Sequence, residues 1–212
     1  NGNGIYQQLL GSTAEMPRTG DPQLTDVRPT LTLGAAQAIL PQLIDNDVAF
    51  ANTGSNYNGA SLLVYFTSGA VSSETLSIRN EGAGATQVGL SGTDVTFGGT
   101  LVGSFSGGSG GAPLSVTFNA SATAEAVEAV VENIQYQFAA ASAPAGTTNR
   151  TVAFRFTDGN ANSAPPVQTT ITIQAANPSV SLTLDDVVAS QSITETQAQA
   201  GVLLDSDVQF VQ

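Results

Sequence analysis

Two pairs of aspartates are the first residues in this chain whose type and spacing suggest chemistry. Asp45 and Asp47 lie in the stretch LIDNDVAF, and Asp205 and Asp207 lie in LLDSDVQF, 160 positions later. In an extended chain, residues two apart point to the same side, so each pair brings two carboxylates together. Like charges held close are unfavourable without a cation or hydrogen-bond donors. Because Ca²⁺ prefers oxygen ligands, each pair is a candidate Ca²⁺ site.

A second polar cluster, Asp158, Asn160 and Asn162, lies in the stretch TDGNANS. This stretch is expected to form the loop between the last two strands of a domain. In a Greek-key sandwich such a loop can approach the end of the first strand. We therefore predict a shared Ca²⁺ site made of Asp45, Asp47, Asp158 and Asn160, completed by backbone carbonyls. Both patterns also form turns, so the spacing alone leaves a purely structural role open.

Composition limits the partners of this chain. It has 212 residues and a formal charge of −12, from 17 acidic and five basic residues. Such a charge repels nucleic acid and anionic lipid, so we expect neither as a partner, and no apolar run is long enough for a membrane helix. The excess of carboxylates suits Ca²⁺, although it can equally serve only to keep the protein in solution.

The missing residue types limit catalysis. The chain has no histidine, lysine, cysteine or tryptophan, so it lacks disulfides, Ser-His or Cys-His nucleophiles and amine chemistry. Paired carboxylates can hydrolyse glycosides, but such enzymes usually stack sugars on aromatic surfaces, and this chain has only four tyrosines. We therefore predict that it is not an enzyme.

Short apolar stretches separated by glycine and serine predict an all-β fold. Their spacing of about ten residues is typical of a β-sandwich with hairpins. The predicted strands are 30–33, 48–51, 61–67, 75–79, 87–90, 94–97, 101–105, 114–118, 134–138, 152–156 and 168–173. The stretch SGGSGG at 106–111 is predicted to be a loop rather than a linker, because strand-like sequence resumes directly after it.

One segment, 124–133, predicts a helix. Val127, Val130, Val131 and Ile134 form a single apolar stripe at i, i+3, i+4 and i+7. Asn119 or Ser121 is expected to cap this helix. The three glutamates on the opposite side are expected to face solvent. They are Glu125, Glu128 and Glu132.

Three regions follow from these patterns. Residues 1–28 are predicted to be an N-terminal extension, and 29–176 a sandwich domain. Residues 177–212 are predicted to be the first strands of a following repeat or a tail donated to another molecule. Within them, Ser179–Leu184 resembles the PTLTL stretch of 29–33, and the last strand needs a sheet edge to join.

The set of motifs resembles the cadherin-like repeats of large bacterial surface proteins and adhesins. The matching stretches are LIDNDVAF, NYNGASLLVYFTSG, ETLSIRNEG, QVGLSGTDVTFGG, VGSFSGGSGGAPLSVTFNASAT, AVEAVVENIQY and RTVAFRFTDG, within residues 43–159. The resemblance implies a Greek-key sandwich of the cadherin or immunoglobulin type, tandem repetition and Ca²⁺ at repeat junctions. Asp45, Asp47 and Asp158 match acidic positions of that family. Asn160 stands where the family often has a second aspartate.

The resulting expectation is a calcium-stiffened extracellular module, secreted or on a bacterial surface. We expect it to assemble head-to-tail with copies of itself through strand or tail exchange. The alternative is a carbohydrate- or receptor-binding module of a larger adhesin, with the loops 52–58 and 106–111 as its contact surfaces.

Overall fold

The chain divides into two units, residues 1–176 and 177–212, which are considered one at a time. The computed structural model describes residues 21–52, 54, 56–140 and 144–175, and the backbone of Thr183–Asp185 and Gln209–Val211. Within that part of the chain, strands dominate and two short helices accompany them, so the predicted all-β class is confirmed. No helix among the described residues is long and apolar enough to cross a membrane.

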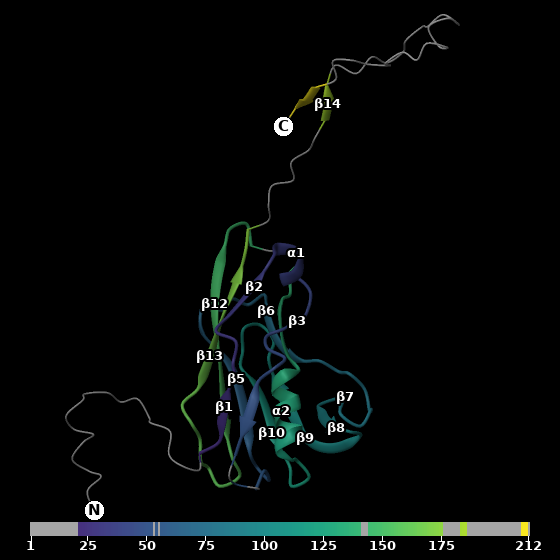
Figure 1. Cartoon of the computed structure of the whole chain (residues 1–212), viewed down its shortest axis with the longest axis vertical. Coiled ribbons are helices and arrows are strands. Elements are labelled where there is room, and N and C mark those ends of the chain that lie inside the picture. Colours follow the sequence, from purple (N-terminus) through teal and green to yellow (C-terminus); the bar gives the residue numbers. More distant parts are fainter. Residues whose placement is uncertain are drawn as a thin grey trace, which may run out of the picture. The chain divides into compact units, whose positions relative to one another are not determined.

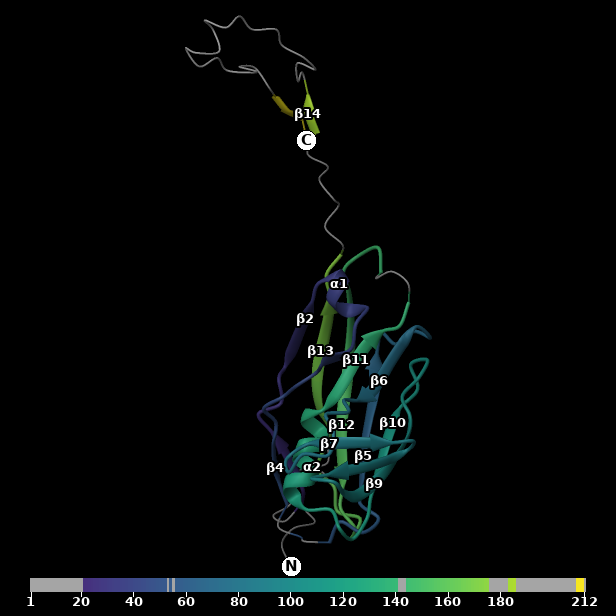
Figure 2. The same cartoon turned by 90° about the vertical axis from the view of Figure 1, so that its right-hand side faces the viewer.

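The first unit contains a large sheet and a small one (Figures 1 and 2). The large sheet has the order β2-β13-β12-β5-β10-β9-β8-β7 and is antiparallel except for the β2–β13 pair. The small sheet has the order β3-β11-β6, and a separate pair joins β1 to β4. The bounds are β1 Gln23–Thr25, β2 Thr30–Leu33, β3 Gln42–Leu43, β4 Ala49–Ala51, β5 Ser61–Ser68, β6 Glu74–Ile78, β7 Val88–Ser91, β8 Asp94–Phe97, β9 Thr100–Gly107, β10 Leu114–Phe118, β11 Ile134–Phe138, β12 Thr148–Thr157 and β13 Val167–Ile173.

A single apolar core fills the space between the sheets. Strands alternate in burial, so β5 turns Leu62 and Val64 inward from the large sheet, and β11 turns Tyr136 inward from the small one. The Phe66 and Tyr136 rings meet across the two layers with centroids 6.2 Å apart. This shared core makes the first unit sandwich-like.

Helix α2, Ala124–Glu132, packs against this core as its apolar stripe predicts. Its cap differs from the prediction: the Thr123 hydroxyl accepts a hydrogen bond from Ala126 N at 3.1 Å, whereas Asn119 Oδ1 accepts one from Ser121 N in the preceding turn. Glu125 is exposed, but the solvated role expected for Glu128 was wrong, because its carboxylate accepts a 2.7 Å hydrogen bond from Phe50 N. The helix therefore holds β4.

Two edge strands are covered by other parts of the chain. Along β7, the Asn80 side chain accepts a hydrogen bond from Leu90 N and donates one to Leu90 O, as a neighbouring strand would. Along β6, the glycine-rich loop after β9 closes on the strand: Gly108 O accepts from Leu76 N, and Gly111 N donates to Glu74 O. Gly108 has φ of 89°, and a Cβ there would lie 2.2 Å from Leu76 O. Residues 108–111 thus form a loop as predicted, whereas Ser106 and Gly107, the first two residues of the SGGSGG stretch, end β9.

The segment from residue 21 to residue 52, which we call the first ribbon, follows a path that the sequence did not predict in full. Gln23–Thr25 was assigned to the N-terminal extension, yet it forms β1 and pairs with β4. Between β2 and β4 the ribbon adds the helix α1, Ala35–Ala38, and β3. These elements are two to four residues long, so they depend on tertiary pairing more than on local pattern.

The second unit contains one described strand pair, β14 (Thr183–Asp185) and β15 (Gln209–Val211). Its register joins Thr183 to Val211, Leu184 to Phe210 and Asp185 to Gln209. Subtracting 160 from each number gives the register of β1 with β4 residue for residue. Residues 181–212 are therefore called the second ribbon. The strand at Thr183–Asp185 corresponds to β1, not to the 29–33 stretch with which its sequence was compared.

Candidate functional site

The first predicted metal ligands, Asp45 and Asp47, lie between β3 and β4. Asp45 is buried with 1% of its surface exposed, and its carboxylate accepts hydrogen bonds from the backbone N–H groups of Arg28 and Asp47. Asp47 is exposed. Asp45 thus ties the start of β2 to the start of β4 through two backbone donors, while Asp47 stays open to solvent.

Further acids surround this pair. The pKa of Asp47 is raised chiefly by a hydrogen bond to Asp45 and by the Asp45 charge; Arg28 opposes the rise and Asp26 adds to it. Burial, followed by the charges of Glu128, Asp45, Asp47 and Glu81, raises the pKa of Glu132. Glu81 is paired with Arg79, and the five other acids are what we call the acidic cluster: Asp26, Asp45, Asp47, Glu128 and Glu132.

Three members of this cluster were not among the ligands predicted from the sequence. Asp26 was placed in the extension, although its counterpart at the same 160-residue spacing, Asp186, was a usable signal. Glu128 and Glu132 were expected in solvent. The contact of Glu128 with Phe50 N and the approach of Glu132 to Asp47 follow from the docking of β4 against α2, two segments far apart in the sequence.

The other predicted ligands, Asp158 and Asn160, lie together in the loop after β12. Asn160 N donates to Asp158 Oδ1 at 2.9 Å, and Asn162 N donates to the same oxygen at 2.8 Å. Burial opposes ionisation of Asp158, but the Asn162 and Asn160 hydrogen bonds outweigh it and lower its pKa. The Asp158 carboxylate therefore stabilises its own loop. This is the structural, turn-forming role that the sequence pattern left open as an alternative to metal binding.

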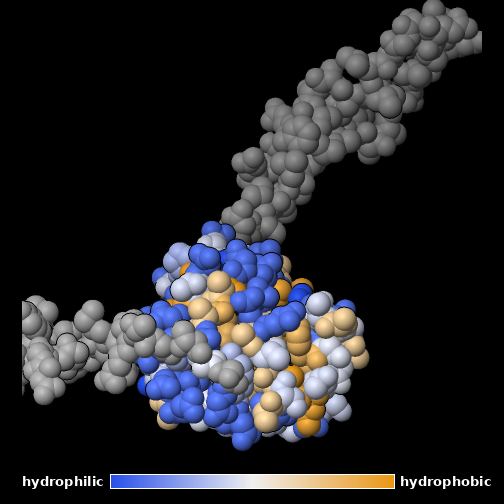
Figure 3. Space-filling view, turned by 60° about the horizontal axis from the view of Figure 1, so that its bottom comes forward, coloured by the Kyte–Doolittle hydropathy of each residue, from blue (hydrophilic) through white to orange (hydrophobic). Residues whose placement is uncertain are grey.

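This loop meets the segment after β4 rather than the acidic cluster. Gly159 N donates to Asn56 O at 3.0 Å, and the Asn56 and Asn160 side chains are hydrogen-bonded. Across the described ranges, no three acidic side chains are arranged to hold a metal ion. The structure thus does not gather Asp45, Asp47 and Asp158 into the predicted shared site. Figure 3 shows one face of the molecule, where hydrophilic residues dominate and apolar ones are scattered between them.

Asp205 and Asp207 lie outside the described residues. The described strand β15, Gln209–Val211, follows them in the sequence and pairs with β14. In the first ribbon the equivalent aspartates directly precede β4.

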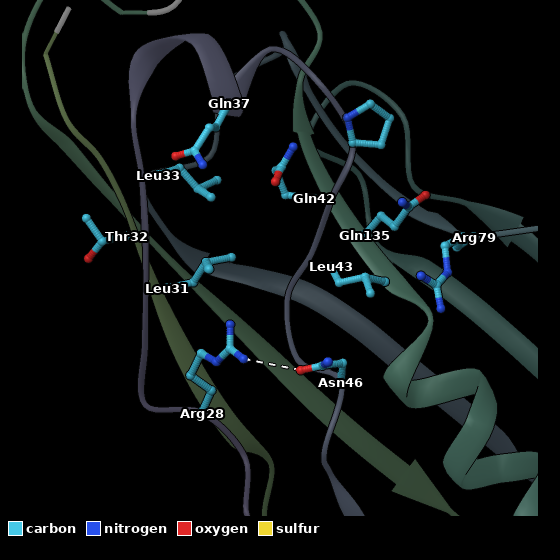
Figure 4. A pocket seen from close by; sticks show the side chains of 11 residues that line it. Arg28, Leu31, Thr32, Leu33, Gln37, Gln42, Leu43, Asn46, Arg79 and Gln135 are labelled. Carbon is cyan, nitrogen blue, oxygen red and sulfur yellow. Dashed lines mark hydrogen bonds between the residues drawn. The ribbon is translucent and has the colours of Figure 1, made fainter.

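A polar groove of about 540 Å³ lies between β2 and β3, the edge strands of the two sheets. Arg28 stands on one side and Arg79 on the other, and the Arg28 guanidinium donates to Asn46 Oδ1 at 3.3 Å (Figure 4). Gln37, Gln42 and Gln135 add amide groups. Two of the chain's five basic residues therefore face this groove, and none of its lining residues is acidic.

A buried polar group joins the two sheets. Glu74 on β6 has 0% of its surface exposed and accepts hydrogen bonds from Val71 N, from the Tyr136 hydroxyl at 2.9 Å and from Arg150 Nε on β12. The Arg150 guanidinium lies 5.5 Å from the centre of the Phe138 ring. Burial, then the Glu74 charge, raises the pKa of Tyr136, so its hydroxyl remains a donor. The group braces the sandwich.

No protein-family model, curated protein or solved structure matches the chain.

Proposed function

We propose that this chain is a repeated structural module that binds Ca²⁺ at the acidic cluster and assembles head-to-tail with copies of itself. The observation that carries the proposal is the second ribbon, which repeats the β1–β4 register at a spacing of 160 residues. It also repeats three acids of the cluster, since Asp26, Asp45 and Asp47 correspond to Asp186, Asp205 and Asp207. Because the strand register and the three acids recur together in both ribbons, we infer that they serve a common role.

Electrostatics supports the cation. The pKa of Asp47 is raised first by its hydrogen bond to Asp45 and that of Glu132 first by burial, and in both the charges of neighbouring carboxylates raise the pKa further, so ionised carboxylates repel one another in this cluster. Carboxylates are the ligands that Ca²⁺ prefers, so the donor chemistry fits. Because the described acids are not arranged as a ligand set of three, binding requires the exposed Asp26 side chain to rotate toward Asp45 and Asp47.

The finer features of the proposal come from the resemblance to cadherin-like repeats. They are a Greek-key arrangement of the cadherin type, an extracellular location on a bacterial surface, and a role in adhesion or in a filament or surface layer. The shared core of two sheets and the absence of cysteine are consistent with a sandwich that gains stiffness from bound cations instead of disulfides.

Calcium is expected to raise the melting temperature by roughly 5–10 °C at about 100 times the dissociation constant. This calcium-induced increase in melting temperature should become larger as the pH rises from about 4 to 7. Asp47 and Glu132 have raised pKa values when folded, so without the cation they contribute stability at low pH that is lost as they ionise. Thermal melts with Ca²⁺ or chelator at several pH values measure both effects.

Variants at the exposed Asp47 and the half-buried Glu132 test the site without removing the buried Asp45. Asp47→Asn combined with Glu132→Gln should abolish most of the calcium effect, whereas Asp94→Asn, an exposed acid on β8, should leave it intact. Asp158→Asn should also leave it intact, because that carboxylate serves its own loop. Equal melting temperatures with calcium and with chelator would refute the metal part of the proposal.

The groove between β2 and β3 favours a second candidate function, the binding of an acidic carbohydrate. Its amide side chains suit hydroxyl groups and Arg28 suits a carboxylate or sulfate. Arg28→Ala keeps the backbone N–H that holds Asp45, so it should preserve the fold and weaken binding to acidic glycans about tenfold or more. An array of acidic and neutral glycans tests this; equal binding by wild type and variant would reject the groove as the site.

A further inference from the structure

The first ribbon is held on the sandwich by contacts that we call the ribbon seat. β13 pairs with β2, and β11 pairs with β3. Glu128 of α2 accepts from Phe50 N, and the Phe50 ring lies 4.8 Å from Phe156 and 6.4 Å from Tyr57, measured between centroids. Many of these contacts involve backbone atoms, so a different ribbon with the same core residues can make them.

The second ribbon carries those core residues. Eight described residues of the first ribbon are buried, and the residues 160 positions later are identical at five and apolar at the other three. The identical pairs are Leu24 with Leu184, Ala38 with Ala198, Asp45 with Asp205, Val48 with Val208, and Phe50 with Phe210; the apolar pairs are Pro22 with Leu182, Leu33 with Ile193, and Ile44 with Leu204.

Residues that line the polar groove are repeated less often: Gln37 and Leu43 have identical counterparts in Gln197 and Leu203, but others do not. Arg28, Leu31 and Gln42 correspond to Val188, Gln191 and Val202. Similarity between the ribbons is therefore highest at the buried positions of the seat, although the exposed Asp26 and Asp47 are repeated as well. Asp45 keeps its counterpart because its hydrogen-bond donors are backbone N–H groups, which any residue except proline supplies.

We propose that the second ribbon of one copy occupies the ribbon seat of a second copy and replaces that copy's first ribbon there. The inference rests on the proposed self-assembly and names the contact that builds it. Donor and acceptor surfaces differ, so the contact is heterologous and extends into an open chain of copies. The resident first ribbon has the advantage of being tethered to its own seat, so exchange rises with protein concentration.

Charged substitutions in each ribbon of the full chain test the exchange. Leu184→Asp with Phe210→Asp should reduce assembly at least tenfold in sedimentation velocity and leave the melting temperature of the first unit unchanged. Leu24→Asp with Phe50→Asp should instead promote assembly at concentrations at least tenfold lower. The matched control is Thr196→Asp with Ser206→Asp, which adds the same charge at positions whose counterparts, Ala36 and Asn46, are exposed.

The outcomes separate this inference from the proposed function. If wild type assembles and the Leu184→Asp, Phe210→Asp variant assembles equally well, the ribbon inference is wrong while self-assembly stands. If wild type never assembles, with or without calcium, the proposed assembly is wrong. The ribbon inference is then tested by the Leu24→Asp, Phe50→Asp variant alone. Oligomers of that variant support exchange between copies; a monomer, folded or unfolded, overturns it.

Discussion

Replacing Glu74 by alanine is expected to lower the free energy of unfolding by about 3–5 kcal/mol, because it leaves the Arg150 guanidinium buried without its carboxylate. Arg150 is 3% exposed and Glu74 is 0% exposed, so water cannot replace the lost partner without opening the core. The same change leaves the Tyr136 hydroxyl and Val71 N without their acceptor. Urea denaturation followed by circular dichroism measures the loss.

A double variant separates the charge from the packing. Glu74→Leu combined with Arg150→Met removes both charges and keeps apolar volume, so its loss should be smaller than that of Glu74→Ala. Arg155→Met on the same strand is the control, because that residue is exposed. A double variant less stable than the single one would show that the ion pair itself stabilises the fold, beyond avoiding an unpaired charge.

Phe156→Ala is expected to have a comparable effect, about 3–5 kcal/mol, through loss of apolar burial and the cavity that remains. Phe156 is 3% exposed, and its ring meets those of Phe50, Tyr57 and Phe118. Urea unfolding again gives the magnitude, and Phe105→Ala, at a half-buried position on β9, should cost clearly less. Equal losses at the two positions would mean that the aromatic group around Phe156 has no special part in the fold.

Phe156→Ala also bears on the ribbon seat, since Phe156 contacts Phe50 of the first ribbon. Hydrogen exchange should show faster opening of β1 and β4 in this variant than of β10, which is held on both sides by β5 and β9. Uniform acceleration of all strands would indicate a global effect instead.

The strands and the main helix could be predicted because their burial alternates with the period of each element. β8 and β10 have the bounds predicted from sequence, and the Val127 to Ile134 stripe faces the core. The same alternation placed Arg150 in phase with Val152, Phe154 and Phe156, and this signal of an inward-facing arginine was not used. Its partner Glu74 is likewise in phase with Leu76 and Ile78.

The candidate site could be predicted only in part. The Asp45–Asp47 spacing is local, so the sequence shows it. Which acids approach that pair depends on how α2 meets β4, a contact spanning 78 positions, and no local pattern encodes it. The Asp158 carboxylate accepts hydrogen bonds from three donors within its own loop, Asn160 N, Asn162 N and Asn162 Nδ2, so local turn geometry prevailed over the predicted long-range site.

The covering of β6 and β7 has a consequence for solubility. An open strand edge is a template for unintended pairing with other chains, and acidic charge alone does not block backbone hydrogen bonds. In this molecule the Asn80 side chain forms hydrogen bonds with the edge of β7 as a neighbouring strand would. The loop after β9 covers the edge of β6, and its glycines allow the two backbones to lie close together. The molecule thus suppresses non-specific aggregation at these two edges.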